Sequence, residues 1–248
     1  MKIFSLCFLA FLTAASCSNS ATPVTSVPQV KSPSAQINGC LSEDEVAMKL
    51  LAMAKSDYEK ANEIKESLLN ESQKSSVCRQ SLIESVVRRM DRPLSSNADK
   101  ADQADRFGIW RAGPDVLGYL KATEAVDFLV DHLDFTSGVF SMTMSHQPAL
   151  RAVMEIGESA IPKLSDTLRH HPDWKMRMDA VYCISGIGGP AAVRALKEAL
   201  PSESDVCVKP FIEVSIKSLD NAQQKWKHEN NNEWFGKYMF CNHSTQGE

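Results

Sequence analysis

The sequence predicts an all-α protein, a short right-handed α-solenoid of helix pairs with a helical N-terminal cap and a C-terminal capping tail. Segments 125–133, 160–168 and 192–200 share one pattern, in which Ala and a branched apolar residue precede two leucines four residues apart. The copies begin 35 and 32 residues apart (125 to 160, 160 to 192), and a second apolar helical stripe precedes each copy. Helix pairs with such a period predict a stack, because one pair cannot bury its apolar face alone.

Length, charge and hydropathy exclude several classes of protein. The 248 residues carry 27 Lys and Arg against 31 Asp and Glu, a net charge of -4. This balance argues against a nucleic-acid-binding protein, which normally needs a concentrated basic face. No apolar run reaches the roughly 18–20 residues that a membrane-spanning helix requires. The composition therefore favours a globular, soluble protein.

Residues 1–16 predict a secretory signal peptide, because Lys2 is followed by a short apolar stretch and then by small residues. Cleavage after Ser16 would leave Cys17 at the new N-terminus. This arrangement resembles the lipobox of bacterial lipoproteins, with Ala14 where the lipobox has Leu. The resemblance implies that Cys17 is the site of lipid attachment; a signal cleaved beside an incidental cysteine is the alternative. In both cases we expect an exported protein, periplasmic or at the cell surface, and anchored to a membrane where Cys17 is lipidated.

Residues 17–39 are rich in Ser, Thr and Pro and carry one charge. Such a segment buries too little apolar surface to offset the entropy cost of ordering, so it predicts a disordered tether. Residues 40–110 predict a helical cap on the N-terminal end of the stack. Ser42 and Glu45 have the spacing of a capping box, whereas the Asp-, Asn- and Ser-rich residues 92–105 predict a loop.

Residues 111–219 contain the repeats. Gly157 and Gly188 follow the leading helices of the second and third copies, where a residue with positive φ ends a helix at low cost. Lys121 takes this place in the first copy. A fourth leading helix is predicted to start near Val206.

Segments 149–164 and 179–200 resemble the HEAT-like repeats of many bacterial proteins, in which the first helix ends in Ile-Gly and the second opens with Ala-Val or Ala-Ile. The resemblance covers residues 111–219 and implies an α-solenoid. HEAT-like proteins are chiefly binding scaffolds, and some bacterial members are phycobilin lyases. A fold of this kind says more about architecture than about activity.

Residues 220–248 are polar and then aromatic. We expect this tail to cap the last repeat through its aromatic residues; an exposed partner-binding segment and a disordered tail are the alternatives. The aromatic residues are Trp234, Phe235, Tyr238 and Phe240.

Seven cysteines are present, and no Cys-x-x-Cys spacing indicates a redox or zinc motif. Five of them lie in the part expected to fold, so at least one stays unpaired. Cys183 occupies a predicted core position, as a small buried side chain. Cys207 with Cys241 and Cys40 with Cys78 are the candidate disulfides, although spacing proves neither. No metal site is predicted.

The segment 134–147 is longer than the roughly two to eight residues that usually join packed helices. It either packs locally or binds a partner. The apolar candidates for partner binding are Phe135, Val139, Phe140, Met142 and Met144.

A second candidate surface comes from Asp131, Asp166 and Glu198, which occupy equivalent positions on successive second helices. In a stack they form an acidic ladder that could bind a basic partner. Because Lys163, Arg194 and Lys197 lie nearby, a merely solvated surface of mixed charge is the alternative.

The favoured function is that of a non-enzymatic, monomeric scaffold, without cofactor, that binds a protein or an envelope component. No G-x-S-x-G, H-E-x-x-H, P-loop or Rossmann motif is present. The first alternative is a lyase-like HEAT enzyme acting on a bound chromophore or another small ligand. The second is a structural or lipoprotein-assembly component.

Overall fold

The computed structural model describes residues 39–93, 97–136 and 147–220, which all belong to one unit of the chain, Gln36–Glu248. Within these ranges the protein is all-helical, without strands, as predicted. The predicted signal peptide, the tether before Gly39 and the tail after Asp220 lie outside the described residues. The helices are α1 (Glu43–Lys55), α2 (Tyr58–Gln73), α3 (Ser76–Asp91), α4 (Lys100–Tyr119), η1 (Thr123–Ala125), α5 (Val126–Val130), α6 (Pro148–Ile156), η3 (Glu158–Ala160), α7 (Ile161–His170), α8 (Trp174–Ile187), α9 (Gly189–Ala199) and α10 (Val208–Asp220).

Helix α1 begins with the predicted capping box. The Ser42 hydroxyl accepts a hydrogen bond from the Glu45 backbone N–H (3.3 Å), and Glu45 Oε2 accepts one from the Ser42 backbone N–H (2.7 Å). These bonds satisfy two backbone donors that an uncapped helix leaves unpaired. The apolar face of α1 then buries Val46 and Leu50 completely.

Helix α4 begins earlier than the sequence predicted. Residues 92–105 were expected to form a loop, but the helix starts at Lys100 because Asp99 accepts hydrogen bonds from the backbone N–H groups of Ala101 and Asp102. Of the polar residues that predicted a loop, Lys100, Asp102 and Gln103 are instead exposed residues in the first turn of this helix. The predicted boundary between cap and repeats, at 110/111, therefore falls inside α4.

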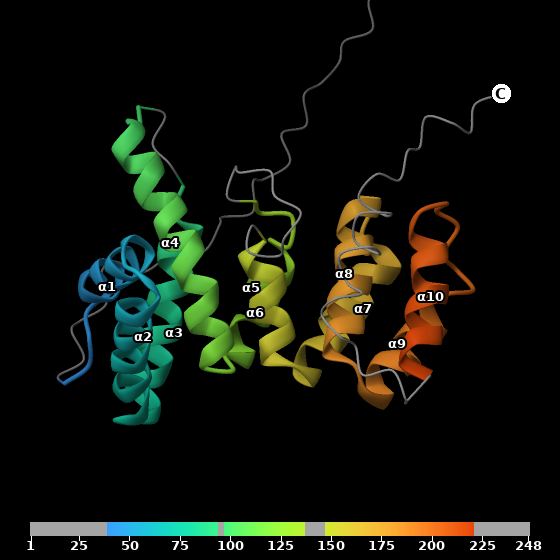
Figure 1. Ribbon diagram of the computed structural model, residues 1–248, viewed down its shortest axis with the longest axis horizontal. Helices are drawn as coiled ribbons and strands as arrows, with labels where there is room; N and C mark the ends of the chain where they lie inside the picture. Colours follow the sequence, from blue (N-terminus) through green and yellow to red (C-terminus); the bar gives the residue numbers. More distant parts are fainter. Residues whose placement is uncertain (1–38, 94–96, 137–146, 221–248) are drawn as a thin grey trace, which may run out of the picture. The chain divides into compact units, whose positions relative to one another are not determined.

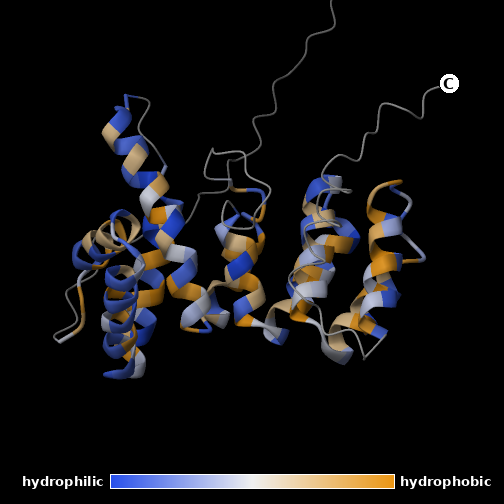
Figure 2. Ribbon diagram, in the orientation of Figure 1, coloured by the Kyte–Doolittle hydropathy of each residue, from blue (hydrophilic) through white to orange (hydrophobic). Residues whose placement is uncertain are grey.

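After α3 the chain continues through α4, η1–α5, α6, α7, α8, α9 and α10 (Figure 1), and α5 contacts α6 as α7 contacts α8. The leading helices α4, α6, α8 and α10 contact one another in that order, and so do the second helices α5, α7 and α9. Hydrophobic and hydrophilic residues alternate along the helices, as expected of amphipathic helices (Figure 2). The patterned leucines Leu129, Leu164 and Leu196 are fully buried in one continuous core.

The turns after α6 and α8 follow the predicted chemistry. Gly157 and Gly188 cap α6 and α8 with φ of +92° and +69°. Lys121 takes the corresponding place after α4 with φ +51°, a conformation that non-glycine residues adopt at some cost. Helix α5 is shorter than the predicted segment 125–133; it ends at Val130, with Asp131 as its C-cap.

Candidate functional site

The structure describes only residues 134–136 and 147 of the predicted partner-binding loop, and Val139, Phe140, Met142 and Met144 lie outside the described residues. Phe135 is partly buried, and its ring stacks on the indole of Trp110 with a centroid distance of 4.0 Å. The Trp110 indole N–H in turn donates to the Met90 carbonyl (2.9 Å). Phe135, near the start of the loop, is therefore packed against α4.

The predicted acidic ladder lies on helices that contact one another in succession. The side chains of Asp131 and Asp166 are 59% and 64% exposed, and Glu198 is exposed as well. Lys163 Nζ on α7 lies 2.9 Å from Asp131 Oδ1 at the end of α5, whereas Asp166 pairs with His170 on its own helix. The surface is thus a mixture of charges rather than purely acidic.

A hollow of about 700 Å³ lies at α9 and α10, beside the last ladder residue. Glu198 lines it together with Arg194, while Val193 and Leu219 supply apolar lining. Lys197 and Asp220 form an ion pair of 2.9 Å that joins the two helices at this hollow. Apolar lining with charged groups beside it is an arrangement found in protein-binding surfaces.

A second cleft, of about 460 Å³, lies among α1, α2, α4 and α6, and it was not predicted. Its lining includes three basic and three acidic side chains, together with Met53, Ala61, Pro148 and the Tyr58 ring. The charged residues are Lys65, Arg111, Arg151, Asp57, Asp115 and Glu155.

Asp115 is the centre of the charges in this cleft. Lys65 Nζ lies 3.4 Å from Asp115 Oδ2, and the guanidinium of Arg151 contacts the other carboxylate oxygen. The side chains of Lys65 and Asp115 are only 18% and 17% exposed, so water screens their attraction less than at an open surface. Arg151 Nε also lies 3.7 Å from Glu155 Oε1.

Burial raises the pKa of the Glu155 carboxyl above its usual value; Arg151 opposes this rise and Asp115 adds to it. Next to the cleft, the Tyr119 hydroxyl donates a hydrogen bond to Glu66, which raises the pKa of the tyrosine. Lys65 Nζ lies 4.9 Å from the centre of the Tyr119 ring, in cation–π geometry. Lys65 is therefore held by both a carboxylate and an aromatic ring.

The signal for this cleft in the sequence was a charged residue within an apolar run, Asp115 in the segment 112–118. Its partners Lys65 and Arg151 lie 50 and 36 residues away along the chain. No spacing rule connects positions so far apart, so the convergence follows only from how the helices that carry these residues pack together.

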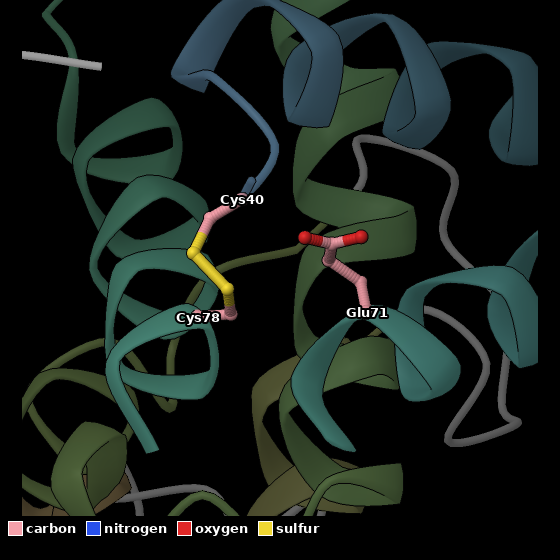
Figure 3. A group of neighbouring side chains, drawn as sticks. All are labelled: Cys40, Glu71 and Cys78. Carbon is pink, nitrogen blue, oxygen red and sulfur yellow. A yellow bond between two sulfur atoms is a disulfide. The ribbon is translucent and has the colours of Figure 1, made fainter. Parts of the chain in front are cut away.

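Cys40 and Cys78 form a disulfide, one of the two candidate pairings. Glu71 lies beside it, and the ligand atoms of all three residues lie within 4.8 Å of one another (Figure 3). Two thiolates and a carboxylate are zinc-type ligands, but here the sulfur atoms are bonded to each other. Glu71 Oε1 instead accepts a hydrogen bond from the Leu41 backbone N–H (3.0 Å), so the group fastens the start of α1 to α2 and α3.

Cys207 is disulfide-bonded, but Cys241 lies outside the described residues, and their pairing stays a prediction. Cys17 also lies outside them, so its lipidation stays a prediction. Cys183 is a free, fully buried cysteine in the core, and burial raises the pKa of its thiol well above the usual value. This residue fits the predicted role of a small apolar side chain.

None of the helices in the described ranges is both long enough and apolar enough to cross a membrane. Comparison with known proteins finds no matching protein-family model and no matching curated sequence.

Proposed function

We propose that this chain is a non-enzymatic, exported scaffold of HEAT-like repeats that binds a protein or envelope partner through the side of the stack formed by α5, α7 and α9. The repeat assignment rests on the shared pattern of the second helices and on the order in which the helices contact one another. Export rests on the signal-like residues 1–16 and on Cys17.

The observation that carries the proposal is the arrangement of exposed charge on the second helices. Asp131, Asp166 and Glu198 come from α5, α7 and α9, which contact one another in that order, and all three residues are exposed. The hollow at α9 and α10 adjoins the last of them and adds apolar surface. A partner with basic groups and an apolar anchor would complement this surface, because opposite charges steer the encounter and apolar contacts slow dissociation.

The test is a charge reversal of the ladder, Asp131→Lys, Asp166→Lys and Glu198→Lys in one chain. Cross-linking in the producing cells, with quantitative mass spectrometry, should recover a partner with the natural protein and lose it with the ladder variant. Purified partner should then bind the variant at least about tenfold more weakly, since close charge pairs contribute 1.5 kcal/mol or more.

A matched control reverses three exposed acidic residues on other helices, Glu59, Glu63 and Glu213. This control should keep the partner, and circular dichroism should show that both variants remain folded. Equal recovery of the partner with ladder and control variants would exclude this surface as the binding site.

A further inference from the structure

The cleft among α1, α2, α4 and α6 contains polar groups that have no partner among the residues that the structure describes. Its volume of about 460 Å³ falls within the 300–1,000 Å³ typical of small-ligand sites. Arg111 lines it, is exposed, and makes no ion pair or hydrogen bond with any described residue. The Asn62 amide also lines it and has no hydrogen-bond partner among the described residues.

Arg111 and Arg151 are the two arginines that line the cleft. Arg151 is anchored by Asp115 and Glu155, yet its side chain remains 45% exposed and can still donate to a ligand. Asp115 is four residues after Arg111, on the same face of α4. A planar carboxylate suits this pair, because guanidinium groups bind carboxylates through two parallel hydrogen bonds.

The charge balance argues against a dianion. Three carboxylates, Asp57, Asp115 and Glu155, line the same cleft as the three cations. A phosphate group would meet these acids with nearly twice the charge of a carboxylate, and so with greater repulsion. A single negative charge fits the cleft better.

The remaining groups suit a peptide backbone and its side chains. The Asn62 amide offers both a hydrogen-bond donor and an acceptor. A peptide group offers the matching acceptor and donor. Met53, Ala61 and Pro148 supply apolar lining, and the Tyr58 ring, in a residue that is 81% exposed, adds an aromatic surface. We propose that this cleft binds a short peptide segment through its free C-terminal carboxylate, held by Arg111 and Arg151.

The test screens two libraries of N-acetylated tetrapeptides against the full chain, one with free C-terminal carboxylates and the other with carboxamides. Sequences should be enriched from the free-acid library alone. Titration of an enriched tetrapeptide should then show binding that inorganic phosphate does not displace, and Arg111→Gln should weaken this binding about tenfold or more.

Arg194→Gln is the matched control, because Arg194 is another exposed arginine without an ion pair among the described residues, on α9. It should leave tetrapeptide binding unchanged, and so should the ladder reversal, which separates this site from the α5–α7–α9 surface. Fusing the enriched tetrapeptide to the C-terminus of a carrier protein distinguishes the sources: binding of the fusion assigns a protein tail, and binding of the free tetrapeptide alone assigns an oligopeptide. Enrichment from neither library, equal enrichment from both, or full binding by Arg111→Gln would overturn the proposal.

Discussion

Arg177 and Glu203 form a largely buried, two-point salt bridge between the first turn of α8 and the loop before α10. Arg177 Nε donates to Glu203 Oε2 (2.9 Å) and Nη2 donates to Oε1 (3.3 Å), and the side chains are only 16% and 7% exposed. Nη1 of the same arginine donates to the backbone carbonyls of His171 and Pro172, 3.0 and 3.1 Å away. One guanidinium thus joins the loop before α8 to the loop before α10.

Replacing Arg177 by an apolar residue should make the protein easier to unfold. Arg177→Met leaves the Glu203 carboxylate buried without its cation and should lower the free energy of unfolding by about 3–5 kcal/mol. Guanidinium denaturation followed by circular dichroism measures the loss. The control is Lys197→Met, which breaks a pair whose side chains are 51% and 49% exposed and should cost less than about 1 kcal/mol. Similar losses in both variants would contradict the structural role of the Arg177–Glu203 pair.

Removing the Cys40–Cys78 disulfide should destabilise the protein, because the unfolded chain gains conformational entropy when the bond is absent. The bond closes a segment with a sequence separation of 38, for which the chain-entropy relation gives about 4 kcal/mol at 25 °C. Denaturation of Cys40→Ser and of the double variant Cys40→Ser, Cys78→Ser should give the same loss, because each removes the same bond. A loss below about 1 kcal/mol, or a much larger one in the double variant, would refute this account.

Asp179 on α8 should make stability fall as the pH rises. Burial, with Asp134 and Asp173 adding repulsion and Lys175 opposing it, raises the pKa of its carboxyl from 3.8 to about 8. Between these values the folded state holds a proton that the unfolded state has lost, so higher pH favours unfolding. Denaturation at intervals from pH 5 to 8.5 should show a steeper decline for the natural protein than for Asp179→Asn. Parallel curves would mean that Asp179 does not cause the decline.

Replacing Gly118 by a larger residue should destabilise the protein, because α4 and α6 contact each other at this position. A Cβ at this position would lie 2.6 Å from Glu155 Oε2 and 3.0 Å from the Ala152 Cα. Since the Ala152 backbone cannot move without shifting α6, Gly118→Ala should cost about 1–3 kcal/mol in thermal or chemical denaturation. Gly186→Ala is the control, because its close neighbour is the flexible Met154 side chain rather than backbone. A larger loss in the control would show that backbone contact is not what limits Gly118.

The positions of the helices could be predicted because their determinants are local. Leu129, Leu164 and Leu196 are each followed by another leucine four residues later, which is a helical spacing, and Gly157 and Gly188 mark where leading helices end. The start of α4 was missed because Asp99 and its neighbours form a helix cap from residues that equally favour a loop. Composition alone cannot separate these two outcomes.

The chain itself determines which of its stretches become helices and which of their faces are apolar, since both depend on residues within a few turns of one another. Only the tertiary structure brings Lys65 and Arg151 to the two oxygens of Asp115, or Arg177 to Glu203. Such contacts depend on the angles and distances at which whole helices pack, and these are set by the summed fit of many side chains rather than by any local pattern.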